Sequence, residues 1–133
     1  MNKPANSFKT CARCGRVMTW RRKWAHQWEQ IRYCSKRCSR ARLRQTDHLL
    51  EKAIFSLLCS RSGTICPSEA ARVVAPENWR DLMEPARCAG RRMAARGEVV
   101  FKQSGKTVDP SEFKGLVRLD QGPKFHEANP GDV

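Results

Sequence analysis

The residues of this chain that are best suited to chemistry are four cysteines near its N-terminus. Cys11 and Cys14 form a C-x2-C pair followed by Gly15, and Cys34 and Cys38 form a C-x3-C pair. Two close pairs separated by a spacer of about 20 residues fit a tetrahedral four-cysteine site, because each pair can come from one local structure. The spacing predicts one structural Zn²⁺, with all four positions filled by protein ligands and none open to a substrate.

A redox dithiol at the first pair is the alternative to a metal. It leaves the second pair unexplained, and no thioredoxin-like βαβ pattern surrounds it. The other three cysteines lie far apart in the sequence. We expect Cys59 and Cys88 to be buried or half-buried thiols in helices, whereas Cys66 could lie at a helix N-terminus.

Positive charge is concentrated in the first third of the chain. The 133 residues carry a formal net charge of +13. Residues 1–45 contain 4 Lys and 9 Arg against one acid, Glu29, and residues 46–133 contain 5 Lys and 8 Arg against 12 acids. Such local density predicts a surface that binds phosphates, and a merely solvated face is the alternative.

The spacer and the segment behind the second cysteine pair supply the candidate phosphate ligands. Trp20, Trp24 and Trp28 recur at helical spacing, and we expect at least two of them to fill the small core of the finger, with a base-stacking platform as the alternative. The stretch "SKRCSRARLR" predicts a basic helix with Lys36, Arg40 and Arg44 on one face. The nucleic-acid candidates of this region are Arg21, Arg22, Lys23, Lys36, Arg37, Arg40 and Arg44.

The rest of the chain has the order of elements expected of a winged helix-turn-helix domain. Apolar periodicity predicts a helix from residue 46 and a short extended piece before a helix that opens at Pro67. A third helix ends at Gly97 and is either kinked at Pro85 or begins near Met83. The stretch "EVVFKQSGKTVDP" predicts a β-hairpin that turns at Ser104–Gly105.

The third helix and the hairpin supply the remaining candidate contacts. The spacing of apolar residues in the third helix places four of them on its core face: Leu82, Ala86, Ala89 and Met93. The opposite arc would present donors to the major groove, and the hairpin turn would touch the minor groove or the backbone. The candidates are Arg80, Arg87, Arg91, Lys102 and Lys106.

The strings "CARCGRVMTWRRKWAHQWEQIRYCSKRC", "ICPSE" and "WRDLM" resemble two families of bacterial domains of unknown function that can occur fused. The resemblance covers roughly residues 8–119. One family is a four-cysteine finger and the other looks like a winged-helix domain. The "YCSxxC" element is similar to the helix-side ligands of treble-clef fingers.

The predicted fold class is therefore a small α+β protein with two modules and a tail. Residues 1–45 form a basic, treble-clef-like four-cysteine zinc finger. Residues 46–121 form a winged helix-turn-helix domain of three helices plus a β-hairpin wing. Residues 122–133 form a disordered tail.

These features predict a non-enzymatic zinc-binding protein that binds nucleic acid, with DNA favoured. The alternative is an adaptor that docks on an acidic protein or a ribonucleoprotein. An enzyme is disfavoured because there is no nucleotide loop, no catalytic carboxylate pair and no open metal position. No stretch approaches the length of a membrane span, and the N-terminus lacks a signal-peptide core, so we expect a cytoplasmic protein without a membrane partner.

Overall fold

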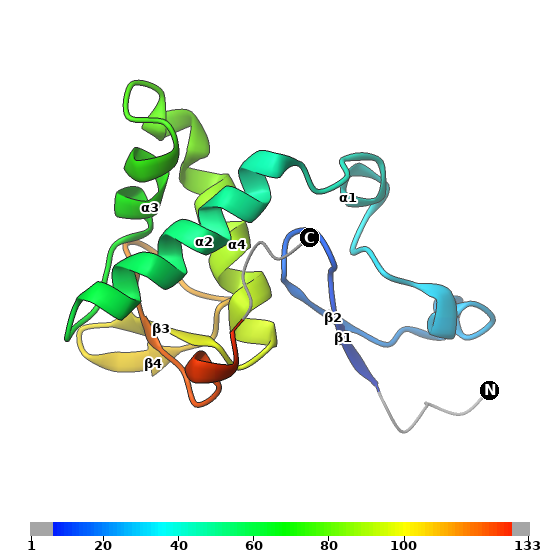
Figure 1. The fold of residues 1–133 in the computed structure, drawn as a ribbon. Coiled ribbons are helices and arrows are strands. Elements are labelled where there is room, and N and C mark those ends of the chain that lie inside the picture. Colours follow the sequence, from blue (N-terminus) through cyan, green and yellow to red (C-terminus); the bar gives the residue numbers. More distant parts are fainter. Residues whose placement is uncertain (1–6, 129–133) are drawn as a thin grey trace.

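The computed structural model describes residues 7–128, which form a small α+β fold with two small sheets and four helices (Figure 1). Residues 7–44 are called the finger below, and residues 45–128 the helical module. The elements of the finger are β1 (Phe8–Thr10), β2 (Val17–Thr19), the 3-10 turns Arg22–Trp24 and Trp28–Gln30, and α1 (Lys36–Arg40).

The finger has a very small interior. β1 and β2 pair antiparallel, with Lys9 opposite Met18, and the side chain of Met18 points inward. The prediction that three tryptophans share one helical face is wrong, because residues 20–28 form no α-helix and hold only short 3-10 turns. The light-blue segment that carries these turns projects away from the helices of the second part (Figure 1).

The helical module packs three helices against a three-stranded sheet. Its elements are α2 (Gln45–Ser60), α3 (Pro67–Val74), the 3-10 turn Trp79–Leu82, α4 (Met83–Ala95), β3 (Val99–Gln103), β4 (Lys106–Val108), β5 (Arg118–Gln121) and the 3-10 turn Phe125–Glu127. The predicted core face of α4 is confirmed, since Ala86, Ala89 and Met93 are fully buried. α4 begins at Met83, and Pro85 is accommodated in its first turn, where no intrahelical donor is required.

The predicted β-hairpin is present, and the sheet also contains a strand that the sequence pattern did not reveal. β3 pairs with β4, and the two-residue turn between them has positive φ at Ser104 and Gly105, as a type I′ hairpin requires. β5 pairs with the other edge of β3, in the order β4-β3-β5. A single bridge joins Ile65 to Leu119 of β5.

The predicted disordered tail is wrong for residues 122–128. Phe125 is 2 % exposed and stacks on Phe55 of α2, with ring centroids 4.9 Å apart. The backbone N–H of Lys124 donates to the carbonyl of Gly97 at 2.8 Å. One aromatic residue in a polar stretch is enough to hold the segment, because α2 offers it an apolar surface. Residues 129–133, the rest of the predicted tail, lie outside the described part.

None of the helices described between residues 7 and 128 combines the length and the apolar character that crossing a bilayer requires.

Candidate metal centre

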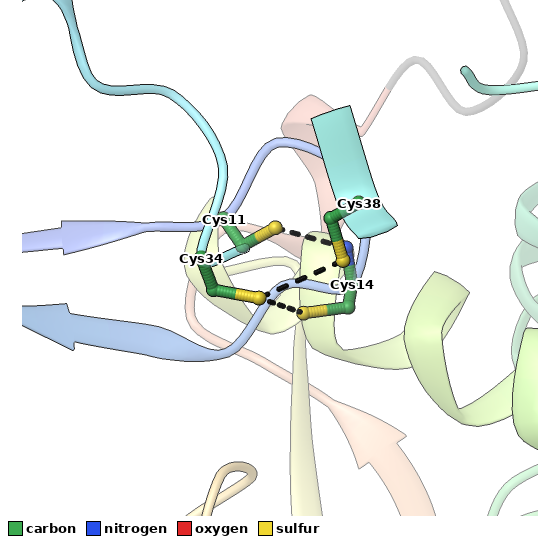
Figure 2. Close-up of side chains that lie close together, drawn as sticks. All are labelled: Cys11, Cys14, Cys34 and Cys38. Carbon is green, nitrogen blue, oxygen red and sulfur yellow. Dashed lines mark hydrogen bonds between the residues drawn. The ribbon is translucent and has the colours of Figure 1, made fainter. Parts of the chain in front are cut away.

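The four predicted ligands converge on one point, although they come from two separate segments (Figure 2). All four sulfurs lie within 4.8 Å of one another. The Sγ of Cys34 is 3.7 Å from that of Cys14 and 3.6 Å from that of Cys38. Four sulfurs placed about 2.3 Å from a tetrahedral metal ion would be about 3.8 Å apart. The cluster therefore has the dimensions of a four-thiolate metal site.

The first pair lies in the tight turn at the tip of the β1–β2 hairpin. The N–H of Gly15 donates to the carbonyl of Cys11 at 3.0 Å, and Gly15 has a φ of +77°, which favours glycine. The N–H of Cys14 lies 3.5 Å from the Sγ of Cys11. The turn therefore aims an amide as well as a second sulfur at the first ligand.

The second pair lies at the start of α1. Ser35 is the N-cap of this helix, and its Oγ accepts from the N–H of Cys38 at 3.2 Å. Cys34 precedes the cap and Cys38 follows it by one turn, so both sulfurs can face the first pair. Cys38 is buried, whereas Cys34 is half-buried at the edge of the cluster.

Electrostatics in the cluster favour a bound cation. A hydrogen bond from the Cys14 thiol lowers the pKa of Cys11 to about 4, helped by the backbone amides of Cys14, Cys34 and Arg13, although burial opposes the shift. The same contact raises the pKa of Cys14, and burial raises that of Cys34. A divalent ion bound to the four sulfurs would stabilise them as thiolates. The all-sulfur donor set suits Zn²⁺.

A fifth cysteine, Cys88 of α4, packs against this cluster without belonging to the four that converge. It is 8 % exposed, and burial raises its pKa, which favours a neutral thiol. Its predicted burial is confirmed. The corresponding prediction for Cys59 is wrong, because Cys59 lies on the exposed face near the end of α2. Cys66 is the N-cap residue of α3, at the helix N-terminus considered for it.

The finger is docked on α4, and this contact was not apparent from the sequence. Gly15 lies so close to α4 that an added Cβ would meet the Cβ of Arg91 and come within 2.6 Å of the backbone nitrogen of Arg92. The Nη1 of Arg92 donates to the carbonyl of Arg13 at 2.6 Å. The one feature of the sequence that could have indicated this contact is Gly15. A glycine at this position is also explained by the turn alone, so it did not predict the contact.

Docking overturns one predicted contact residue. Arg91 was expected on an exposed arc of the third helix, but it is 4 % exposed. Its Nη1 donates to Glu84 at 3.0 Å, and its Nε donates to the carbonyl of Pro110 at 3.0 Å. The helical periodicity correctly placed Arg91 on the side of α4 opposite the core. The expectation that this side is exposed to solvent was wrong, because the finger covers it.

The other candidates of the helical module are partly engaged. Arg87 lies 3.9 Å from Glu84, and Lys102 pairs with Asp120 at 2.7 Å. Arg80 is exposed but lies over the ring of Trp79, at 4.6 Å from its centroid. Lys106 is exposed beside the hairpin turn, where it was expected.

The candidates of the finger are all exposed, and none forms an ion pair within the described part of the chain. They are Arg21, Arg22, Lys23, Lys36, Arg37, Arg40 and Arg44. The predicted basic helix is shorter than expected, since α1 ends at Arg40 and Ala41 leaves helical geometry. Arg44 instead precedes α2, where its backbone N–H donates to Asp47 at 2.8 Å.

The tryptophans divide between interior and surface. Trp28 is 3 % exposed, and Lys9 lies over its ring at 4.8 Å. Trp24 stacks on Trp28, with centroids 6.1 Å apart, but is only half-buried. Trp24 and Tyr33 line a surface groove of about 590 Å³ together with Lys23, Gln27, Gln30, Ile31, Arg32, Cys34, Ser35, Lys36 and Ser39. The stack therefore has one ring in the interior of the finger and one ring that is half-buried at its surface.

Fold and site together define a small α+β protein with a candidate four-cysteine metal centre. Residues 47–122 match the model of a family described as a protein of unknown function (DUF3253). Residues 2–41 match the model of a family described as an uncharacterized protein conserved in bacteria (DUF2256). The first match covers more than half of the chain, which therefore belongs to the DUF3253 family, with the DUF2256 match in tandem before it. A comparison with curated proteins found no match.

Proposed function

We propose that this protein is a non-enzymatic nucleic-acid-binding protein, with DNA favoured, whose finger is held by one structural Zn²⁺. The observation that carries the proposal is the set of exposed finger cations without ion pairs among residues 7–128. Side chains that serve the fold are usually paired when they are charged and buried, whereas these are exposed and form no ion pair among the described residues. Arg21 and Lys23 also lie over the ring of Trp24, each 5.4 Å from its centroid. Their charge is therefore available to phosphates, and each phosphate neutralised would release counterions.

The finer fold assignments belong to the same proposal. A knuckle at a hairpin tip, followed by a short helix that carries the second cysteine pair, supports a treble-clef-like finger. Three helices followed by the β3–β4 hairpin support a winged helix-turn-helix module. β5 is an addition to that plan, and it separates the hairpin from the bridge at Ile65.

The groove beside Trp24 supports a contribution from bases as well as phosphates. Trp24 and Tyr33 supply aromatic surface, and Gln27 and Gln30 supply amides that can bond base edges. Bases are accessible to such a surface when a strand is single or locally opened. Single-stranded DNA, duplex DNA and RNA therefore all belong in the first binding experiment.

The test reverses the charge of α1 in the full, zinc-loaded chain. Lys36→Glu, Arg37→Glu and Arg40→Glu are combined, and binding to the three polymers is measured across a salt series. If the three side chains contact phosphates, the slope of log affinity against log salt should fall by about 3, with most of the affinity lost.

A matched variant controls for the loss of net charge. Lys52→Glu, Lys114→Glu and Lys124→Glu make the same change of charge at exposed positions of the helical module that are not candidate contacts, and they should retain most of the binding. Zinc content and thermal stability show that each variant is folded. Equal binding by the α1 variant and the native chain would refute the proposal.

An adaptor that docks on an acidic protein or a ribonucleoprotein is the second candidate, and one observation favours a protein partner. α2 and α3 border an apolar groove of about 560 Å³, lined by Leu49, Ala53, Leu57, Val73 and Val74 with polar residues at its rim. Val73 is 60 % exposed there. A partner retained by the native chain after nuclease treatment, and lost on Val73→Asp, would favour the adaptor.

A further inference from the structure

We propose that a phosphate group of the bound nucleic acid occupies a cavity between the finger and the helical module. The cavity has a volume of about 290 Å³ and contains three arginines from two segments, Arg13, Arg42 and Arg44. This inference rests on the proposed function for the source of the phosphate, whereas the anion site itself follows from the geometry.

The charges around the cavity favour an anion. Arg13 comes from the turn between β1 and β2, and Arg42 and Arg44 come from the link between α1 and α2. Asp47 is the acid in the lining, and its Oδ2 accepts from the backbone N–H of Arg44 at 2.8 Å. Three arginines against one aspartate leave the lining net positive. The single negative charge of a backbone phosphodiester would neutralise this excess in part, and the dianion of inorganic phosphate would neutralise more of it.

Arg13 has a donor that the described residues leave without an acceptor. Its Nε is buried and forms no hydrogen bond, although its backbone carbonyl accepts from Arg92. A buried charged donor without a partner is costly, because the group has left water and gained nothing in exchange. The fork of N–H groups on a guanidinium matches two phosphate oxygens. A phosphate in this cavity would lie next to Arg13, and a rotation of this side chain would bring the unpaired Nε to it.

The start of α2 adds to the same field. Thr46 lines the cavity and lies in the first turn of a helix of 16 residues. The first N–H groups of a helix point out of its N-terminus and favour an anion there. This contribution supports the arginines and does not make the site alone.

The walls of the cavity come from both parts of the molecule. Leu82 and Pro85 line it from the beginning of α4, and the arginines come from the finger and the link. A phosphate bound here would therefore contact the junction between the two modules. A polymer held by the exposed finger cations would be tied at this point to the helical module as well.

The anion site is tested first with inorganic phosphate on the full, zinc-loaded chain. The side-chain Nε–H signals of arginine are followed by NMR at constant ionic strength, and Arg13→Lys assigns the signal of Arg13. We expect this signal to shift saturably with phosphate and not with chloride. A signal that phosphate does not move would overturn the site.

The source of the phosphate is tested with an oligonucleotide and three single variants. The oligonucleotide should move the same signal at a lower concentration than inorganic phosphate. Arg13→Gln, Arg42→Gln and Arg44→Gln should each weaken binding about tenfold and reduce the salt slope by about 1. Lys114→Gln removes one exposed charge between β4 and β5 and should have little effect.

The outcomes separate this inference from the function on which it rests. If charge reversal on α1 abolishes binding while the three cavity variants behave as Lys114→Gln, the proposed function stands and the inference fails. If phosphate moves the Arg13 signal but no polymer binds, the cavity holds free phosphate, and both the assigned source and the proposed function fail. Zinc content and thermal stability are measured for each variant.

Discussion

The finger and the helical module differ in how they use charged residues, although Arg16 of the finger lies 4.0 Å from Glu84 of α4. The exposed cations of α1 and of the preceding loop form no ion pairs among the described residues, and Glu29 is the one acid in residues 1–45. In the helical module most pairs join neighbouring structural elements or cover the core. They are Arg61–Glu69, Arg87–Glu84, Arg91–Glu84, Arg92–Glu51, Arg96–Glu51, Arg96–Glu98 and Lys102–Asp120.

The two parts also differ in what holds them together. One apolar cluster joins α2, α3, α4 and the sheet, from Leu50 to Phe125. The interior of the finger consists of the cysteine cluster with Met18 and Trp28. So small a core does not stabilise an independent unit, and we expect a metal and the docking on α4 to supply the rest. Because the finger does not depend on ion pairs for its stability, its charged side chains can bind a ligand.

Removing the metal should produce the largest effect and should be confined to the finger. Structural zinc contributes about 10–16 kcal/mol of apparent binding free energy in zinc-finger peptides. We expect one Zn²⁺ per chain by elemental analysis. Chelation should abolish the dispersion of finger amide signals in NMR spectra while the signals of the α2–α4 core persist.

Cys38→Ser should reproduce the effect of chelation, whereas Cys59→Ser, at an exposed cysteine away from the cluster, should bind zinc normally. If chelation unfolds both parts together, the contrast between a metal-held finger and a self-supporting module is wrong.

Breaking a charge pair in the helical module should be much more costly than removing a charge from the finger. Glu51 is 5 % exposed in its side chain and binds Arg92 at 2.7 Å and Arg96 at 2.5 Å. Glu51→Gln leaves the guanidinium of Arg92 buried without its counter-charge, and we expect a loss of about 3–5 kcal/mol in the free energy of unfolding. Arg37→Gln should change it by less than about 0.5 kcal/mol. Denaturant unfolding with zinc present measures both.

Adding a side chain where the finger touches α4 should have an intermediate effect on the free energy of unfolding. Gly15→Ala places a Cβ against the backbone of α4, 2.5 Å from the carbonyl carbon of Arg91, so a flexible side chain cannot relieve the clash. We expect a loss of about 2–4 kcal/mol from overpacking and from the positive φ together.

Gly105→Ala separates these two causes. Gly105 has a φ of +79°, close to that of Gly15, but nothing lies within 4 Å of an added Cβ. Its cost should be about 1 kcal/mol, from backbone conformation alone. Equal losses in the two variants would mean that the finger does not press on α4.

The smallest predicted effect is the pH dependence of a pair at the edge of the sheet. The hydrogen bond from Lys102 lowers the pKa of Asp120. A carboxyl group whose pKa is lower in the folded state stabilises the fold above its unfolded pKa of about 3.9, and the contribution disappears as the pH falls through the folded value. We expect about 0.5 kcal/mol, since the pair is partly solvated.

Carbon-detected NMR titration of the Asp120 carboxyl group measures this pKa directly. Lys102→Met should return it towards its ordinary value while leaving nucleic-acid binding nearly unchanged. A clear loss of binding in this variant would place Lys102 among the ligands, as the sequence pattern first indicated.

Features with a local cause could be predicted from the sequence. The cysteine spacing located the cluster, because C-x2-C and C-x3-C each define one local structure. The Ser104–Gly105 turn located the hairpin, since the dipeptide can adopt the positive φ values of that turn. The tryptophan spacing gave a wrong prediction. It assumed an α-helix over residues 20–28, whereas the two short 3-10 turns found there do not keep the 3.6-residue periodicity of an α-helix.

The sequence by itself determined the four converging ligands, the excess of charge in the first third and the apolar faces of α2 and α4. Only the tertiary structure decided which arginines are free. Arg87 and Arg91 lie on the same side of α4, yet Arg91 is buried beneath the finger and Arg87 is partly exposed. Helical periodicity gives the direction in which a side chain points. Its exposure to solvent depends on whether a segment distant in the sequence packs over it.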